Sequence, residues 1–326
     1  MNAPNDMRHA DVTLQAGPER QREVVERLRA ELPERCILFR EEDTRPYECD
    51  GLSAFRQLPM AVVLPESEMQ VQAVLRACRA LDVPVVARGA GTSLSGGAMP
   101  YGSGIVLAMV KFNRILSIDA TARIARVQPG VRNLAISEAA APHGLYYAPD
   151  PSSQIACTIG GNVAENSGGV HCLKYGLTVH NVLRVRGLTI DGEVLELGGE
   201  ALDSAGLDLL ALVIGSEGML AVVTEVTVKL VPRPLLAQVV MASFDDVVRA
   251  GDAVAQIIAA GIIPAGLEMM DQKTSRAVEP FVRAGYDLDA QAILLAESDG
   301  TPEEVAEEVA RLAEVLKAAG ATALKV

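Results

Sequence analysis

The spacing of apolar residues over the first ninety positions predicts a helix followed by a β-α-β unit. Residues 19–32 carry apolar side chains at helical spacing, which is typical of an amphipathic helix. Apolar runs at 61–67 and 83–89 flank a further amphipathic stretch at 66–82, so two strands enclose a helix. Ligands of open α/β sheets bind at the carboxyl ends of strands, and four glycines follow the second run between residues 89 and 97.

The middle of the chain has β-rich patterns with less room for helices. In order, the pattern predicts short strands at 104–131, a helix at 133–144, a loop-rich stretch at 148–169, a hairpin at 182–199 and a long strand at 220–234. Asp191 and Gly192 mark the turn of the hairpin, and Pro232 and Pro234 end the long strand. With the earlier β-α-β unit, this region indicates two α/β subdomains that share one ligand.

Beyond Pro234, strands and helices alternate. The predicted strands are 237–244, 263–270 and 290–298, and the predicted helices are 245–261, 271–285 and 301–320. The last helix has Thr301 as its N-cap, Pro302 in its first turn and Gly320 at its end. A new strand begins in the final residues, from which we expect the natural polypeptide to be longer. A short terminal strand is the alternative.

An unfinished sheet would leave the apolar face of this last helix uncovered. That face consists of Val305, Val309, Leu312 and Leu316. Because exposed apolar surface promotes association, the sequence predicts that the chain self-associates through this face.

Composition narrows the class of protein. A chain of 326 residues can form two domains, and its 49% hydrophobic and 22% charged residues are ordinary for a globular protein. The net charge of −13 argues against binding to nucleic acid or to anionic membranes. Five cysteines without C-x-x-C spacing predict neither a disulfide framework nor a zinc site, and favour a reducing cytosol. The N-terminus lacks a signal-peptide core, and no apolar run reaches the ~18 residues of a membrane span.

The first glycine-rich loop, residues 89–97, differs from two common nucleotide-binding motifs. Leu94 stands where the dinucleotide fingerprint G-x-G-x-x-G needs its third glycine, and no acidic residue follows at the expected distance. No lysine follows the glycines, as a P-loop would require. The small residues can still turn several backbone N–H groups toward an anion. Taken alone, this loop is equally compatible with a tight turn between strand and helix.

Two further glycine-rich segments favour the ligand over the turn. Residues 149–169 are rich in glycine, serine and asparagine without apolar periodicity, and residues 213–226 hold Glu217 between Gly215 and Gly218. Glycines let a backbone approach a ligand closely. Three such loops over ~130 residues fit a ligand longer than a single phosphate, such as a flavin dinucleotide.

Four segments in order resemble the FAD-binding domain of the vanillyl-alcohol-oxidase and PCMH type. They are residues 84–97, 149–169, 174–182 and 214–225. Within that superfamily they are similar to the family of glycolate oxidase and the D-2-hydroxy-acid (D-lactate) dehydrogenases. The similarity covers about residues 47–234 and continues more loosely to the end of the chain.

This resemblance implies an α+β fold. A PCMH-type FAD-binding domain made of two α/β subdomains would be followed by an incomplete ferredoxin-like substrate domain. The expected boundaries are a helical segment at 1–54, the FAD-binding domain at 55–234 and the start of the substrate domain at 235–326.

The resemblance also implies FAD-dependent oxidation of a small 2-hydroxy acid of the glycolate or D-lactate type, with a hydride passing to flavin N5. Electrons would leave to an acceptor other than oxygen, either an iron–sulfur partner subunit or a quinone. The chain would be cytoplasmic, or held at a membrane by its partner. The alternative is an FAD-binding chain without turnover because its substrate domain is incomplete. An NAD-dependent enzyme is disfavoured by Leu94.

The same resemblance implies three groups of cofactor-binding residues. The pyrophosphate loop would comprise Arg88, Gly89, Ala90, Gly91, Thr92, Ser93, Gly96 and Gly97. The flavin and its ribityl chain would be lined by Asp150, Pro151, Ser152, Thr158, Gly160, Gly161, Ala164, Asn166 and Gly168, with Tyr175 and Gly176 close by. The adenosine side would be bordered by Glu217, Gly218 and Val222.

Two departures from the family limit what can be transferred. Some members bind FAD covalently through a histidine of the first loop, but Thr92 stands here, so we expect non-covalent FAD. His171, near the second loop, is the other histidine that could form such a bond, and an ordinary hydrogen-bonding role for it is the simpler interpretation. The family's H-x-x-G-D-G-N-x-H motif, which supplies a metal site and the catalytic base, is absent, and no histidine follows Pro234. No catalytic or metal-binding residue is therefore assigned.

Overall fold

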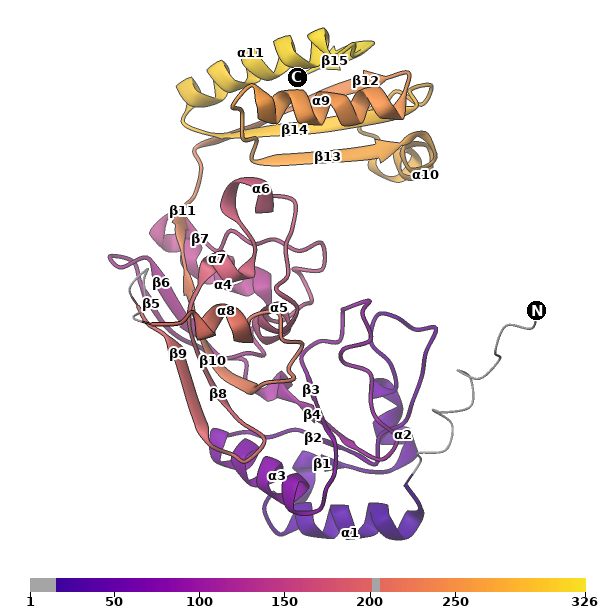
Figure 1. The fold of residues 1–326 in the computed structure, drawn as a ribbon, viewed down its shortest axis with the longest axis vertical. Coiled ribbons are helices and arrows are strands. Elements are labelled where there is room, and N and C mark those ends of the chain that lie inside the picture. Colours follow the sequence, from indigo (N-terminus) through magenta and orange to yellow (C-terminus); the bar gives the residue numbers. More distant parts are fainter. Residues whose placement is uncertain (1–15, 201–205) are drawn as a thin grey trace, which may run out of the picture. The chain divides into compact units, whose positions relative to one another are not determined.

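The computed structural model describes residues 16–200 and 206–326, and their ribbon is drawn in Figure 1. These residues divide into two compact units. The first unit comprises the described residues up to 147 together with 153–167 and 178–230, and the second comprises 148–152, 168–177 and 231–326. The first fifteen residues of the predicted N-terminal segment 1–54 lie outside the described range. The predicted domain boundaries stay a prediction.

A four-stranded sheet in the first unit contains the predicted β-α-β unit. Its strands, in spatial order, are β1 (Ile37–Leu38), β2 (Ala61–Val63), β4 (Ile105–Ala108) and β3 (Val85–Arg88). The three strands β2, β4 and β3 are parallel, and β1 is antiparallel to β2. Periodicity predicted β2 and β3 but not that β4 lies between them, because strand order is set by pairing distant in sequence.

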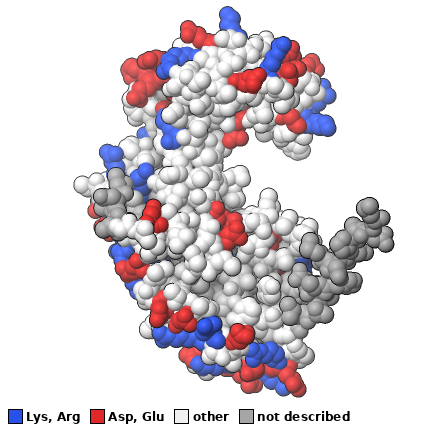
Figure 2. All heavy atoms as spheres, in the orientation of Figure 1, with Lys and Arg blue, Asp and Glu red and all other residues white. Residues whose placement is uncertain are grey.

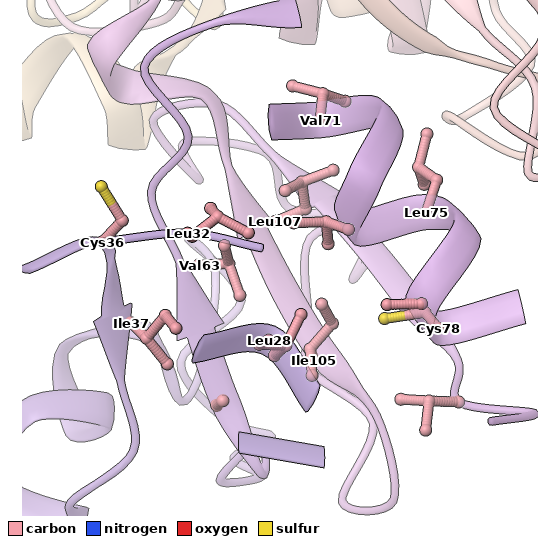
Figure 3. Packing of buried hydrophobic residues seen from close by; sticks show 14 of the residues in the cluster. Leu28, Leu32, Cys36, Ile37, Val63, Val71, Leu75, Cys78, Ile105 and Leu107 are labelled. Carbon is pink, nitrogen blue, oxygen red and sulfur yellow. The ribbon is translucent and has the colours of Figure 1, made fainter. Parts of the chain in front are cut away.

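Two amphipathic helices pack their apolar faces into the core of this sheet. They are α1 (Pro18–Arg29) and α3 (Glu68–Ala80), and α3 begins at Ser67, whose side chain accepts a hydrogen bond from the Gln70 N–H. Figure 3 shows Leu28 of α1 and Leu75 of α3 among the side chains of this cluster. Burial of each such side chain stabilises the fold by roughly 1.5–3 kcal/mol.

The second sheet of the first unit has five antiparallel strands. In spatial order they are β5 (Ile115–Asp119), β6 (Ile124–Val127), β10 (Val222–Lys229), β8 (Val182–Leu188) and β9 (Val194–Gly198). The predicted hairpin is confirmed, since β8 pairs with β9 and Gly192 adopts φ +72° in the turn. The predicted long strand corresponds to β10, which pairs with both β6 and β8.

Shorter elements complete the first unit. They are α2 (Glu41–Thr44), α4 (Asn133–Ala140), α5 (Ile159–Glu165), α7 (Thr178–Asn181), α8 (Leu209–Val213), β7 (Leu145–Tyr146) and the 3₁₀ turns Glu34–Cys36, Arg45–Tyr47, Met109–Lys111 and Ala141–His143. The stretch predicted to be rich in loops, residues 148–169, contains one helix that the sequence pattern did not indicate, α5. Its two glycines disfavour a helix, but Ile159 and Val163 are buried in the core, and packing outweighs propensity.

The second unit is built on a four-stranded antiparallel sheet. In spatial order its strands are β13 (Gly266–Asp271), β14 (Ala292–Gly300), β12 (Leu236–Phe244) and β15 (Ala323–Lys325). The helices are α9 (Val247–Ala259), α10 (Gln272–Val282), α11 (Pro302–Ala318) and the short α6 (Cys172–Tyr175), and β11 spans Val231–Pro232. Numbered along the chain, the four strands of this sheet lie in the order 2-3-1-4, which is the predicted ferredoxin-like arrangement.

The expectation that the last helix presents an uncovered apolar face is wrong. Val305, Leu312 and Leu316 are each 0% exposed. Helix α11 packs against β12 and β14, and β15 pairs with β12 from Ala323 to Lys325. The helix is therefore covered by strands formed earlier in the chain, and three residues of β15 suffice to extend the sheet. The self-association predicted through this face therefore loses its basis, because the face is buried against the sheet.

Charged side chains of both signs are interspersed on the surface of the first unit. Figure 2 shows Lys and Arg beside Asp and Glu over the region of α1 and α3. Ion pairs such as Arg27 with Glu31 at 2.6 Å belong to this surface. Exposed pairs of this kind contribute about 0–1 kcal/mol each, so the core carries the stability of the unit.

Candidate functional site

The first glycine loop begins where β3 ends at Arg88. Gly91 and Gly96 adopt φ values of +69° and +82°, which residues with a side chain rarely adopt. At Gly89 a Cβ atom would lie 2.2 Å from Thr158 Oγ1, so only glycine fits beside that hydroxyl. The loop therefore depends on glycine both for its conformation and for close contact with the second motif.

The second motif supplies helix α5 and the residues at its two ends. Gly160 packs against Pro129, where a Cβ would lie 2.5 Å from the proline Cβ. Asn162 Nδ2 donates to Asn133 Oδ1 at 2.8 Å inside the core. At the end of the helix Asn166 adopts φ +50°, and its side-chain oxygen accepts from the Val179 N–H at 2.9 Å. These contacts fix the backbone of the motif independently of any ligand.

The third glycine loop is hydrogen-bonded to the second motif. The Gly215 N–H donates to the Val163 carbonyl and the Glu217 N–H to the Ala164 carbonyl, both at 2.8 Å. Glu217 has φ +54° and Gly218 φ +74°, so the loop turns sharply after these contacts. The first and third glycine-rich loops thus meet residues 158–166 of the second within the first unit, although the three segments lie up to ~130 residues apart.

Several features of this meeting point fit an anionic, elongated cofactor. Thr158 Oγ1 is buried and has no hydrogen-bond partner among the described residues, which leaves a donor for a ligand. Among those residues nothing lies within 4 Å of the Cβ position of Gly96, so the loop is open on that side. FAD therefore fits the residues present, with the backbone N–H groups of residues 89–97 suited to its pyrophosphate.

One carboxylate at the site was not predicted from the sequence. Ser95 Oγ donates to Glu165 at 3.0 Å from Oε1 and 3.2 Å from Oε2, and Ser93 Oγ lies 2.7 Å from Ser95 Oγ. The hydroxyls of the first loop are thus engaged by an acid at the end of α5. Glu165 stands between two predicted residues, Ala164 and Asn166, and this adjacency is the signal that could have identified it.

Val222, the remaining residue predicted to border the adenosine side, is part of the hydrophobic core. It is 7% exposed in β10 and belongs to the apolar cluster of the four-stranded sheet. Its burial accounts for a valine at this position without a ligand.

Six of the predicted residues belong to the second unit. They are Asp150, Pro151, Ser152, Gly168, Tyr175 and Gly176. Their surroundings there include charged groups of β14. Tyr175 Oη donates to Asp299 Oδ2 at 2.6 Å, and Lys174 Nζ donates to the Asp299 carbonyl at 2.8 Å and to its carboxylate. The sequence did not predict these partners, because residues 174 and 299 are too distant for any local pattern.

His171 lies between two carboxylates of the same unit. Its Nδ1 is 2.6 Å from Asp150 Oδ2, and its Nε2 is 3.4 Å from Glu297 Oε1. The hydrogen bonds to these carboxylates, Asp150 first, raise the pKa of His171 from 6.5 to about 10, so the imidazolium persists at neutral pH. At Gly169 a Cβ atom would lie 2.3 Å from the Asp150 carbonyl oxygen. The lack of a side chain there lets the two segments approach this closely. The hydrogen-bonding role expected for His171 is the one observed.

Comparison with known families identifies two domains along the chain. Residues 59–198 match the family described as FAD binding domain, and residues 233–326 match the family described as FAD linked oxidases, C-terminal domain. Among the described residues no helix is both long enough and apolar enough to cross a membrane.

Three curated proteins illustrate the relationship. The chain is 62% identical over 295 residues to glycolate oxidase subunit GlcD of Escherichia coli (strain K12), covering 90% of this chain and 59% of that protein. It is 40% identical over 280 residues to GlcD of Bacillus subtilis (strain 168), covering 86% and 60%. It is 32% identical over 308 residues to a D-lactate dehydrogenase of Anaerostipes hadrus, covering 92% and 64%. The chain thus spans less than two thirds of the length of these relatives.

Solved structures support the fold. Alkyldihydroxyacetonephosphate synthase matches with a TM-score of 0.78 at 21% identity, covering 92% of this chain and 60% of that one. Substrate-bound p-cresol methylhydroxylase matches with a TM-score of 0.80 at 19% identity, covering 95% and 66%. The α+β architecture is therefore that of the PCMH-type flavin oxidases, and the matched FAD binding domain identifies FAD as the cofactor. The chain thus carries an FAD binding domain followed by the C-terminal domain of FAD linked oxidases, and over 90% of its length it is similar to a glycolate oxidase subunit.

Proposed function

We propose that this chain takes part in the FAD-dependent oxidation of a small 2-hydroxy acid of the glycolate or D-lactate type. The observation that carries the proposal is the meeting of three glycine-rich loops in the first unit. Gly89 of the first loop packs against the unpartnered Thr158 hydroxyl of the second, and Gly215 and Glu217 of the third are hydrogen-bonded to Val163 and Ala164. The names of the relatives support the substrate class, since they are glycolate oxidase subunits and a D-lactate dehydrogenase.

In this proposal the chain's residues bind and orient the cofactor. The amides of residues 89–97 hold the pyrophosphate, and Thr158, Gly161 and Asn166 lie along the flavin and its ribityl chain. Glu217 and Gly218 border the adenosine side. When bound, FAD supplies the chemistry that accepts a hydride from the hydroxyl-bearing carbon.

We further propose that electrons leave to an acceptor other than oxygen, through an iron–sulfur partner subunit or a quinone. Two relatives carry the word subunit in their names, which supports a partner. All five cysteines are unpaired thiols, which supports a cytoplasmic setting. FAD is proposed to be non-covalent, because Thr92 cannot form the bond that a histidine makes in tethered members.

The alternative of an FAD-binding chain without turnover is not favoured. The relatives with the highest identity above are glycolate oxidase subunits, and the similarity to them extends over 90% of this chain. The two functions differ in one observable, which is whether a 2-hydroxy acid reduces the bound flavin.

The test is anaerobic reduction of the bound flavin. FAD-loaded protein is mixed with glycolate, D-lactate or L-lactate, and the flavin band at about 450 nm is followed. Loss of the band with glycolate or D-lactate, and not with L-lactate, supports the proposal. Protein that carries FAD but keeps the band with both of these acids, while dithionite bleaches it, supports the alternative.

A further inference from the structure

The buried guanidinium of Arg88 joins three separate pieces of backbone at the first glycine loop. We propose that Arg88 is a positioning residue, which holds the loop against residues 47–51, and not a direct ligand of the cofactor's phosphates. The inference rests on the proposed FAD site and gives one of its residues a different role. It also adds residues 47–51 to the site, a segment that no motif had indicated.

The hydrogen bonds of Arg88 define this role. Its side chain leaves the end of β3, and the residue is only 7% exposed. Nη1 donates to the Cys49 carbonyl at 2.8 Å and to the Ala98 carbonyl at 3.1 Å. Cys49 lies in a different segment, and Ala98 lies at the far end of the loop. The guanidinium therefore connects the start of the loop to its end and to a third backbone segment, the one that contains Cys49.

Two glycines allow the pieces to approach this closely. A Cβ on Gly91 would lie 2.3 Å from Arg88 Nη2 and 2.5 Å from Cζ, so the loop passes directly against the guanidinium. A Cβ on Gly51 would lie 2.8 Å from the Ser93 carbonyl oxygen and 2.9 Å from that of Thr92. The loop is thus held between the guanidinium and the backbone of residue 51, and its amides can be in place before a ligand arrives.

The charge of Arg88 is compensated inside the protein. Burial lowers the pKa of its guanidinium, and the negative charge of Asp50 acts in the opposite direction. Asp50 is 6% exposed, and its Oδ1 accepts from the Leu52 N–H at 2.8 Å. The Tyr47 ring lies beneath the guanidinium with Cζ 5.6 Å from its centroid, a cation–π arrangement. A buried arginine with protein carbonyls, an aromatic ring and an acid around it needs no phosphate to be stable.

Hydrogen exchange on FAD-free protein tests the proposal directly. If Arg88 positions the loop, Arg88→Met will speed amide exchange in residues 47–52 and 89–98 before any cofactor is present. FAD affinity will fall by about tenfold or more, because the amides are no longer preorganised. Arg88→Lys keeps the charge but replaces the guanidinium by a shorter side chain that ends in a single ammonium group, so it will share both defects. Arg79→Met, an exposed residue paired with Asp191, is the matched control and will change neither.

Gly51→Ala perturbs the same brace without changing Arg88. Its Cβ displaces the loop carbonyls, so it will raise exchange in the same two segments and weaken FAD binding, and it provides the test if Arg88→Met does not fold. Unchanged exchange in FAD-free Arg88→Met, with FAD affinity lost, would overturn the proposal and make Arg88 a phosphate ligand. If neither amide exchange nor FAD affinity changes in Arg88→Met, Arg88 does not contribute to the site. Failure of the proposed oxidation leaves both readouts intact, so the two proposals fail separately.

Discussion

At the scale of single residues, glycine is the determinant of the cofactor site. Gly89 and Gly91 lie where any side chain would collide with Thr158 or Arg88, and Gly91 also has a positive φ. A side chain at either position has to displace a neighbour that the loop needs. The consequence is a site that a single methyl group can disable while the surrounding sheet stays intact.

Gly91→Val is expected to abolish FAD binding and to leave the fold largely intact. The β-branched side chain collides with the guanidinium and resists φ +69°. The ratio of flavin to protein absorbance after reconstitution, with circular dichroism for the fold, measures both effects. Val106→Ala in the neighbouring strand β4 is the comparison, since it removes buried apolar surface and costs about 1–3 kcal/mol of stability without loss of FAD. Full FAD content in Gly91→Val would mean that the loop does not bind the pyrophosphate.

Glu165→Gln is expected to strengthen FAD binding, by roughly two- to tenfold. The carboxylate accepts hydrogen bonds from Ser95 at the first loop, where its charge opposes that of a pyrophosphate. Glutamine keeps the size and an acceptor oxygen but removes the charge. Titration of apoprotein with FAD at low and at high salt measures the change, which should shrink as salt rises. Equal or weaker binding by the variant would show that Glu165 does not face the phosphates.

At the scale of elements, short segments in the middle of the chain are held by charged contacts to β14. His171 pairs with Asp150 and with Glu297 of β14, and Lys174 and Tyr175 are hydrogen-bonded to Asp299 of the same strand. All of these residues belong to the second unit. These contacts join helix α6 and the residue before it to a regular strand of the same unit.

The contribution of His171 is expected to depend on pH. Its pKa is 6.5 in an unperturbed state and about 10 in the folded protein, so folding is favoured by the protonated form. The stabilisation is complete below pH 6.5, falls as pH rises from there, and is lost above about 10. At roughly 1.4 kcal/mol per pKa unit it amounts to about 2–5 kcal/mol at its largest.

His171→Asn isolates this contribution. Urea unfolding of the variant and the parent protein at several pH values gives the difference in unfolding free energy. The difference should be large at pH 6 and close to zero at pH 10.5, where the parent imidazole is neutral. A difference that does not change with pH would mean that His171 acts through packing and not through its charge.

At the scale of the whole molecule, the protein should release its flavin intact when it unfolds. Thr92 stands at the tethering position of covalent members, and His171 is occupied by Asp150 and Glu297. Acid or heat denaturation followed by centrifugation should leave a yellow supernatant with FAD and a colourless pellet. Flavin that stays in the pellet would contradict non-covalent binding and would direct attention to His171.

The sequence alone determined the local elements and the chemistry of the loops. The hairpin turn at Gly192, the capped start of α11 at Thr301 and the apolar faces of α1 and α3 follow from short-range preferences of backbone and side chain. The glycine-rich segments and their family resemblance likewise needed no coordinates, because motif order and spacing are properties of the sequence.

Which of these segments contact one another depends on interactions between residues that are far apart in the sequence. Strand β4 lies between β2 and β3, β15 pairs with β12, and α5 forms where two glycines disfavour a helix. The hydrogen bond of Arg88 to the Cys49 carbonyl and that of Ser95 to the Glu165 carboxylate are equally non-local. Such contacts join residues tens of positions apart, and packing and pairing choose among many alternatives that local patterns leave open. Local preference favours one conformation for each segment, whereas burial and long-range hydrogen bonding decide whether that conformation is kept and which other segments it contacts.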